Sequence, residues 1–242
     1  MIQHPKEGKG RLTVAGTVER KVKHDFTKQH FQAAKFFTDC ATHLESEPRG
    51  TDLKDEIRKN QHRAYVVGAI ISAVMGLEAC INEIYLDACD KDQNKLSGLG
   101  EQVMALLAEW WPRLEKSRAD TCLKYQHALL LAGKPAMSEG ENPYQDADSL
   151  VLLRNALTHY KSEWDDSLDQ HGKLRSRLEG RFALNPLSPD AHLWFPHRCL
   201  GSGCARWAIS TAETFVSEFR RRLGIATRIR SAVHPETPEV GS

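Results

Sequence analysis

Residues 64–86 read AYVVGAIISAVMGLEACINEIYL and decide the fold of this protein. At about 100° per residue, apolar side chains occupy two different sides of a helix here: Val67, Ile71 and Val74 on one, and Ala69, Ala73 and Leu77 on the other. A helix that is apolar all round lies in the middle of a bundle. The apolar run from Ala64 to Leu77 is interrupted by Glu78 and is too short to span a bilayer. We therefore expect a buried core helix over about residues 55–88, and no membrane association.

The rest of the chain predicts further helices around this core. A helix is expected from about Phe26, with Asp25 as its cap and an apolar face of Phe26, Ala33, Phe37, Ala41 and Leu44. Others are expected over about residues 101–111, where Pro112 ends or kinks the helix, and over 119–132, 145–164 and 204–223. Between the last two, the long irregular segment 165–203 packs across the bundle or carries function. The fold class is all-α, with an arm over residues 1–24, one domain over 25–223 and a flexible tail over 224–242.

Composition excludes several classes of protein. The chain has 242 residues, of which 40% are hydrophobic and 27% charged, so it is neither disordered nor fibrous. Its 33 basic and 32 acidic residues nearly cancel, so any contact with nucleic acid must come from a local patch. The N-terminal stretch lacks the apolar core of a signal peptide. Three of the six cysteines fall in strongly helical stretches, which favours reduced thiols and a cytoplasmic location.

The predicted helix 145–164 contains SLVLLRNALTHYKSEW at residues 149–164 and carries the candidate chemistry. One side is a core stripe: Leu150, Leu153, Leu157, Tyr160 and Trp164. The opposite side is half-apolar and carries almost no charge: Val151, Leu152, Asn155, His159 and Ser162. A helix with two such stripes has two surfaces to pack against, and the second surface is expected to be a second subunit.

The stretch Arg154-Asn155-Ala156-Leu157-Thr158-His159 resembles the motif of the HEPN superfamily: Arg, a polar residue, three variable residues and His. The upstream stretch 77–83, LEACINE, resembles the acidic, Asn-containing turn of many HEPN-like bundles and adds Glu78 and Asn82 as supporting residues. The resemblance implies a HEPN-like helical bundle and a metal-independent endoribonuclease without cofactors. It also implies a dimer, in which two copies of the motif helix share one RNA cleft.

The residue chemistry agrees with that implication. His159 can take or return a proton near neutral pH. Arg154 is always charged and suits the phosphorane, while Asn155 could orient His159, with Thr158 beside them as a supporting residue. Each chain offers one such histidine, so the acid and the base would come from two subunits. The resemblance also allows a role in stress or phage defence and an antitoxin or activator as partner. However, Lys161 stands where some HEPN toxins have a tyrosine that a partner enzyme modifies.

Four other interpretations compete with this one. Arg154 could be a structural partner of the costly Glu78, in a non-catalytic HEPN-like domain that binds a partner protein or nucleotide. A zinc site could use His192, His197, Cys199 and Cys204, although their spacing lacks the usual C-x2-C knuckle. The basic run Arg220, Arg221 and Arg222 either contacts RNA phosphates or favours a helix C-terminus. A metal hydrolase would depend on Asp165, Asp166, Asp169 and His171, which are more typical of a solvated loop.

Overall fold

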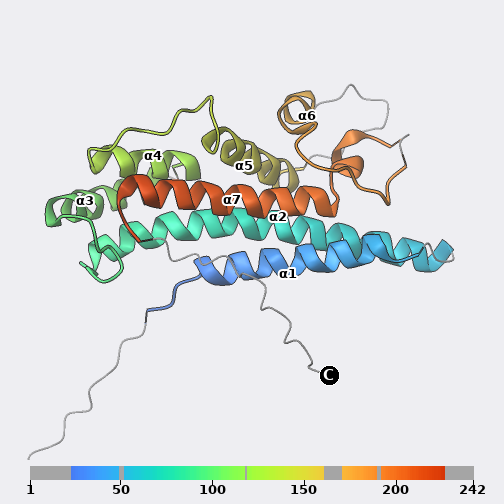
Figure 1. The fold of residues 1–242 in the computed structure, drawn as a ribbon, viewed down its shortest axis with the longest axis horizontal. Coiled ribbons are helices and arrows are strands. Elements are labelled where there is room, and N and C mark those ends of the chain that lie inside the picture. Colours follow the sequence, from blue (N-terminus) through green and yellow to red (C-terminus); the bar gives the residue numbers. More distant parts are fainter. Residues whose placement is uncertain (1–22, 49–51, 118, 161–170, 190–191, 227–242) are drawn as a thin grey trace, which may run out of the picture.

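The computed structural model describes residues 23–48, 52–117, 119–160, 171–189 and 192–226. Within these ranges all regular structure is helical, and no strand occurs (Figure 1). The elements are α1 (Thr27–Ser46), α2 (Asp52–Cys89), α3 (Glu101–Ser117), α4 (Thr121–Leu131), α5 (Tyr144–Thr158), α6 (Gly172–Leu178), a π-helical turn (Trp194–Arg198) and α7 (Ser202–Leu223). The all-α prediction is therefore confirmed for the described residues.

Helix α2 is the centre of the bundle, as its sequence predicted. It packs against α1, α7, α3, α5 and α4, and the long helices α1, α2 and α7 run side by side (Figure 1). Val66, Ile70, Leu77 and Ile81 of α2 are fully buried. Helix α7 closes the core, since it contacts α1, α2, α4 and α5, and its Gly224 ends it in the left-handed conformation with φ 87°. Ile225, just beyond it, is still buried in the core.

Helix α2 is also long and apolar enough to cross a membrane, judged by length and composition alone. The expectation that its apolar run is too short for this was wrong, because the helix continues well beyond Ala64–Leu77. In this structure 56% of the most apolar stretch of α2 is buried inside the protein. Such burial is typical of a core helix of a bundle.

Two glycines of α2 leave room for aromatic rings of α1. A Cβ atom at Gly76 would lie 2.6 Å from Cε1 of Phe31, and one at Gly68 would lie 3.1 Å from Cδ2 of Phe37. These ring contacts turn Phe31 into the core, whereas Phe26 is 56% exposed. The buried face of α1 is therefore Phe31, Ala34, Thr38 and Ala41, of which the sequence pattern predicted only Ala41.

Three predicted boundaries were wrong, each for a local reason. Helix α3 continues through Pro112 to Ser117. Proline has no N–H for the carbonyl of Ala108, four residues earlier, and the thiol of Cys89 lies 3.9 Å from that oxygen instead. Helix α5 ends at Thr158 and not near residue 164. The segment 165–203 is not wholly irregular, since it contains α6 and the π-helical turn.

The carboxylate of Glu45 connects three helices at one end of the bundle. Its oxygens accept hydrogen bonds from the backbone N–H of Ser202 at 2.6 Å and from the Ser202 hydroxyl at 2.5 Å. Nε2 of His62, which is 1% exposed, lies 2.7 Å from the same carboxylate. Burial opposes ionisation of Glu45, but the hydrogen bonds from His62 and Ser202 outweigh it and hold the pKa of Glu45 below its ordinary value.

This carboxylate predicts a specific acid sensitivity. A carboxyl group whose pKa is lower in the folded state stabilises the protein above its unfolded pKa of about 4.3 and loses that effect as pH falls through the folded value. Thermal unfolding measured between pH 7 and pH 2.5 should therefore show a steeper fall in melting temperature for the wild type than for Glu45→Gln, which cannot ionise. Parallel curves for the two proteins would contradict this account.

Candidate functional site

Helix α5 positions the motif by burying one side against the core. Leu150 and Leu153 are fully buried, as predicted, and Leu157 packs partly buried against the core. Val151 is only 3% exposed, so the prediction that it faces outward was wrong. Tyr160, assigned to the core stripe, is 46% exposed. Ser162 and Trp164 lie outside the described residues.

His159 lies at the C-terminal end of α5, where its side chain is exposed. It is the C-cap residue, and its backbone N–H donates to the carbonyl of Asn155 at 2.9 Å. The hydroxyl of Thr158 donates back to the carbonyl of Arg154 at 3.0 Å, a contact that competes with continuation of the helix. The expected mid-helix position of His159 was therefore wrong. Its imidazole is exposed at the C-terminal end of α5.

Arg154 lies one turn before this end and is half-buried. Its Nε atom is buried without a hydrogen-bond partner. Among the described residues no carboxylate forms an ion pair with Arg154. A buried, unpaired donor on a permanent cation is costly, so such a group is a candidate for binding an anion.

Glu78 has Lys124 as its partner, and the expected pair with Arg154 was wrong. The Lys124 ammonium and the Thr121 hydroxyl both donate to the carboxylate of Glu78. Lys124 also donates to Oδ1 of Asn82 at 3.1 Å and lies 5.9 Å from the ring centre of Trp111. The supporting residues Glu78 and Asn82 are therefore brought together by α4, on the side of α2 that α4 covers.

The charge of Arg154 still reaches Glu78 from a distance. Burial opposes ionisation of Glu78, but the hydrogen bonds from Lys124 and Thr121 and the positive charges of Lys124 and Arg154 lower its pKa below the ordinary value. Glu78 is thus a carboxylate that lies between α4 and α5, without a direct contact to the motif arginine.

An aromatic group beside the motif was missed by the sequence analysis. The Tyr160 and His171 rings stack at 6.2 Å with an angle of 11°, and the His171 ring lies 4.5 Å from that of Phe195. We had expected His171 in a solvated loop, but its ring packs against those of Tyr160 and Phe195, and no periodic pattern in the sequence indicates this contact. Asp165, Asp166 and Asp169 lie outside the described residues.

Helix α6 is held against α5 by charged side chains. Nη2 of Arg177 lies 2.6 Å from Oδ2 of Asp148, and Arg181 is paired with Asp146. These two pairs place α6 along α5, so that His171 at its start lies near the end of the motif helix.

The basic run at the end of α7 does not join this site. Figure 1 shows that α7 ends near α3 and α4, whereas α5 ends toward α6. Both Arg221 and Arg222 pair with Glu218, at 2.7 Å each. Arg220 is 8% exposed and donates from Nε to the carbonyl of Ala226. The run therefore stabilises the end of the helix, and Arg220 faces the interior.

The four residues considered for zinc do not form a metal site. Cys199 and Cys204 are fully buried, and burial raises the pKa of both thiols well above the ordinary value. His192 and His197 lie together, with ring centres 5.2 Å apart. In the part of the chain that the structure describes, no group of three or more His, Cys, Asp or Glu side chains is arranged to hold a metal ion.

Comparisons with known proteins leave the motif as the basis for the HEPN resemblance. Neither the protein-family models, nor the curated proteins, nor the solved structures contain a match to this chain.

Proposed function

We propose that this protein is a metal-independent endoribonuclease that acts as a homodimer, with Arg154 and His159 from both subunits at one RNA cleft. In this mechanism the 2′-hydroxyl of the RNA attacks the adjacent phosphorus and displaces the 5′-oxygen of the next nucleotide. One His159 takes the proton of the 2′-hydroxyl and the other gives a proton to the leaving oxygen. Arg154 stabilises the charge that develops on the phosphorane, and Asn155 contacts a phosphate oxygen or His159.

The observation that carries this proposal is the exposed His159 at the end of α5, one turn from an arginine that lacks a carboxylate partner among the described residues. An exposed imidazole can reach a substrate, whereas a histidine packed in the core could not. The guanidinium can bind a phosphate through its planar fork because Glu78 is already neutralised by Lys124.

The second subunit is proposed to cover a partly exposed strip of α5, whose Leu152 also packs in part against the core. With Val151 in the core, this strip consists of Leu152, Asn155 and His159, at spacings of three and four, so that they share one helix face. A dimer across it would bring two imidazoles together and so supply the acid and the base that one chain lacks.

Assembly can be tested by light scattering. The wild type should have the mass of a dimer at micromolar concentration, and Leu152→Glu should have the mass of a monomer, because a carboxylate would be buried at the interface. Leu130→Glu is the matched control, since Leu130 is 60% exposed on α4 and should leave the dimer intact. A monomeric wild type, or an unchanged mass for Leu152→Glu, would contradict the dimer.

The reaction itself can be tested by the chemistry of its products. Attack by the 2′-hydroxyl leaves a 2′,3′-cyclic phosphate on one fragment and a free 5′-hydroxyl on the other, and neither step requires a metal ion. Mass spectrometry of single-stranded RNA cut in EDTA should show these ends. Fragments with 5′-phosphate ends would instead indicate water as the nucleophile and would rule this mechanism out.

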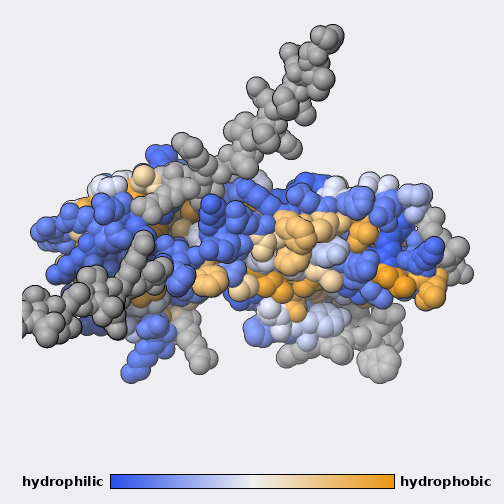
Figure 2. Space-filling view, turned by 90° about the horizontal axis from the view of Figure 1, so that it is seen from below, coloured by the Kyte–Doolittle hydropathy of each residue, from blue (hydrophilic) through white to orange (hydrophobic). Residues whose placement is uncertain are grey.

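A non-catalytic binding domain is the second candidate, and the surface of α1 and α2 favours it. Figure 2 shows apolar side chains gathered on the α1 side of the molecule. Phe36 on α1 is 61% exposed and Met75 on α2 is 46% exposed. Exposed apolar area of this kind often marks a site of protein–protein contact. A protein that dimerises but never cuts RNA would support this alternative.

A further inference from the structure

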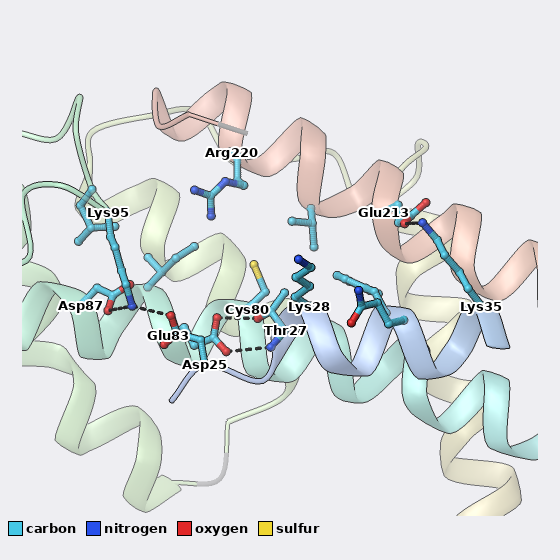
Figure 3. Close-up of a pocket in the computed structure, with 15 residues that line it drawn as sticks. Asp25, Thr27, Lys28, Lys35, Cys80, Glu83, Asp87, Lys95, Glu213 and Arg220 are labelled. Atoms are coloured by element: carbon cyan, nitrogen blue, oxygen red, sulfur yellow. Dashed lines mark hydrogen bonds and ion pairs between the residues drawn. The ribbon is translucent and has the colours of Figure 1, made fainter. Parts of the chain in front are cut away.

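A cavity of about 610 Å³ is lined by residues of α1, α2 and α7 (Figure 3). The start of α1 and the end of α7, which line it, lie away from the end of α5 (Figure 1). Its apolar walls are Phe31, Ile84, Leu96 and Val216. A volume of this size suits a small organic molecule, since ligand cavities usually measure about 300–1,000 Å³.

Glu83, a carboxylate of the cavity wall, binds the start of α1. It accepts hydrogen bonds from the backbone N–H groups of Phe26 at 2.7 Å and Thr27 at 2.9 Å, and from the Thr27 hydroxyl at 2.7 Å (Figure 3). Glu83 thus caps α1 from another helix, the role that the sequence pattern had assigned to Asp25.

The other carboxylates of the cavity are paired with lysines. Oδ2 of Asp25 lies 2.6 Å from Lys95, and Oε1 of Glu213 lies 2.7 Å from Lys35. Asp87 is shared by Lys23 and Lys95, at 2.7 and 3.2 Å. Each of these three acids is therefore engaged by a lysine, and Glu83 by the start of α1.

Arg220 also lines the cavity, and none of these ion pairs includes it. Its side chain points from α7 toward Cys80 (Figure 3), although the residue is only 8% exposed. Its Nε donates to the carbonyl of Ala226 at 2.8 Å, but within the described ranges no carboxylate pairs with it. A nearly buried guanidinium that has no carboxylate partner among the described residues is costly, so it favours an anion from outside the chain.

Lys28 is a second cation of the cavity. It lies in the first turn of α1, at the helix end that the Glu83 carboxylate caps. Lys28 is exposed and lines the cavity opposite Arg220.

We propose that this cavity binds a small organic monocarboxylate, whose carboxylate contacts Arg220 and Lys28 and whose apolar body packs on Phe31, Ile84, Leu96 and Val216. The guanidinium fork matches a carboxylate with two parallel hydrogen bonds. Asp25, Asp87 and Glu213 are already paired with lysines, so Arg220 and Lys28 are the cations left for a ligand, and its carboxylate is the group that they would contact. The ligand is held without a covalent bond, because burial raises the pKa of Cys80 to about 11 and its thiol stays protonated. This inference does not depend on the ribonuclease proposal.

Isothermal titration of the full chain with two matched pairs of compounds tests the proposal: octanoate against octanamide, and naphthalene-1-acetate against its amide. The carboxylates should bind with saturation, and each neutral amide should bind at least about tenfold more weakly, since charge-assisted hydrogen bonds contribute about 1.5–3 kcal/mol. Equal affinity for acid and amide, or no binding of either acid at millimolar concentration, would overturn the proposal. Inorganic phosphate that binds as tightly as octanoate would also overturn it, because the apolar walls would then contribute nothing.

Two variants locate the carboxylate. Arg220→Gln should weaken octanoate binding at least about tenfold, whereas Arg221→Gln, an exposed neighbour paired with Glu218, should leave it unchanged. Because Arg220 is buried, Lys28→Glu provides a second test on an exposed side chain that cannot disturb the core. It should weaken binding by a similar factor, and Lys134→Glu, exposed and outside the cavity, should not. Unchanged affinity in both Arg220→Gln and Lys28→Glu would show that the anion does not bind here.

Discussion

His159→Ala is expected to slow cleavage of single-stranded RNA in EDTA by at least about 100-fold, because a proton-transfer group is typically worth 10²–10⁴ in rate. The measurement is the single-turnover rate on a labelled RNA, at equal dimer concentration. The matched control is His43→Ala, since His43 is an exposed histidine near the C-terminal end of α1 and has no role in the mechanism. Cleavage that survives His159→Ala at the wild-type rate, or that disappears in EDTA for the wild type, would rule this mechanism out.

The arginine is expected to show a different dependence from the histidine. Arg154→Ala should lose a comparable factor, because it removes the cation at the phosphorane. Arg154→Lys should recover only part of the rate, since a point charge lacks the planar fork. Both variants should still dimerise and melt near the wild-type temperature, which separates a chemical role from a structural one. Full recovery in Arg154→Lys would show that charge alone is required.

Glu78→Leu is expected to lower the free energy of unfolding by about 2 kcal/mol, which corresponds to a fall of about 4–8 °C in melting temperature. The reason lies in Lys124, whose side chain is only 7% exposed and would keep a buried charge without its carboxylate. Full burial of such a pair would predict about 3–5 kcal/mol, but Glu78 is 37% exposed and Asn82 remains as a partner, so the effect is smaller. Urea unfolding followed by circular dichroism measures it.

A substitution of the other member of the ion pair provides the control. Lys124→Met should destabilise less than Glu78→Leu, because the carboxylate left behind can be hydrated. The double variant Glu78→Leu/Lys124→Met should recover most of the loss, since both charges are then absent. Arg154→Met should change the unfolding free energy little. A loss in Arg154→Met equal to that in Glu78→Leu would restore Arg154 as the partner of Glu78.

Much of the fold could be read from the sequence because it depends on periodicity along single helices. The apolar run of α2 predicts a central helix whatever surrounds it, since no side of it can face water without loss of free energy. The apolar pattern predicted a helix from about Cys204, close to the start of α7 at Ser202. Gly224 predicted its end, since the left-handed conformation there favours glycine. The motif Arg154-Asn155-x3-His159 can likewise be read from the sequence alone, and the proposed ribonuclease chemistry is inferred from the residue types in it.

What only the tertiary structure decided are the partners of charged and capping groups. Lys124 lies in the apolar stretch TCLKYQHALLL and carries no sign in sequence that it meets Glu78, 46 residues away. Glu83 replaces Asp25 as the cap of α1 in the same way. Tyr160, just beyond the end of α5 at Thr158, lies against His171 and Phe195, which are distant from it in the chain. Hydrogen bonds and ion pairs join residues by distance in space, and the packing of helices around α2 sets those distances, so periodicity along the chain could not reveal them.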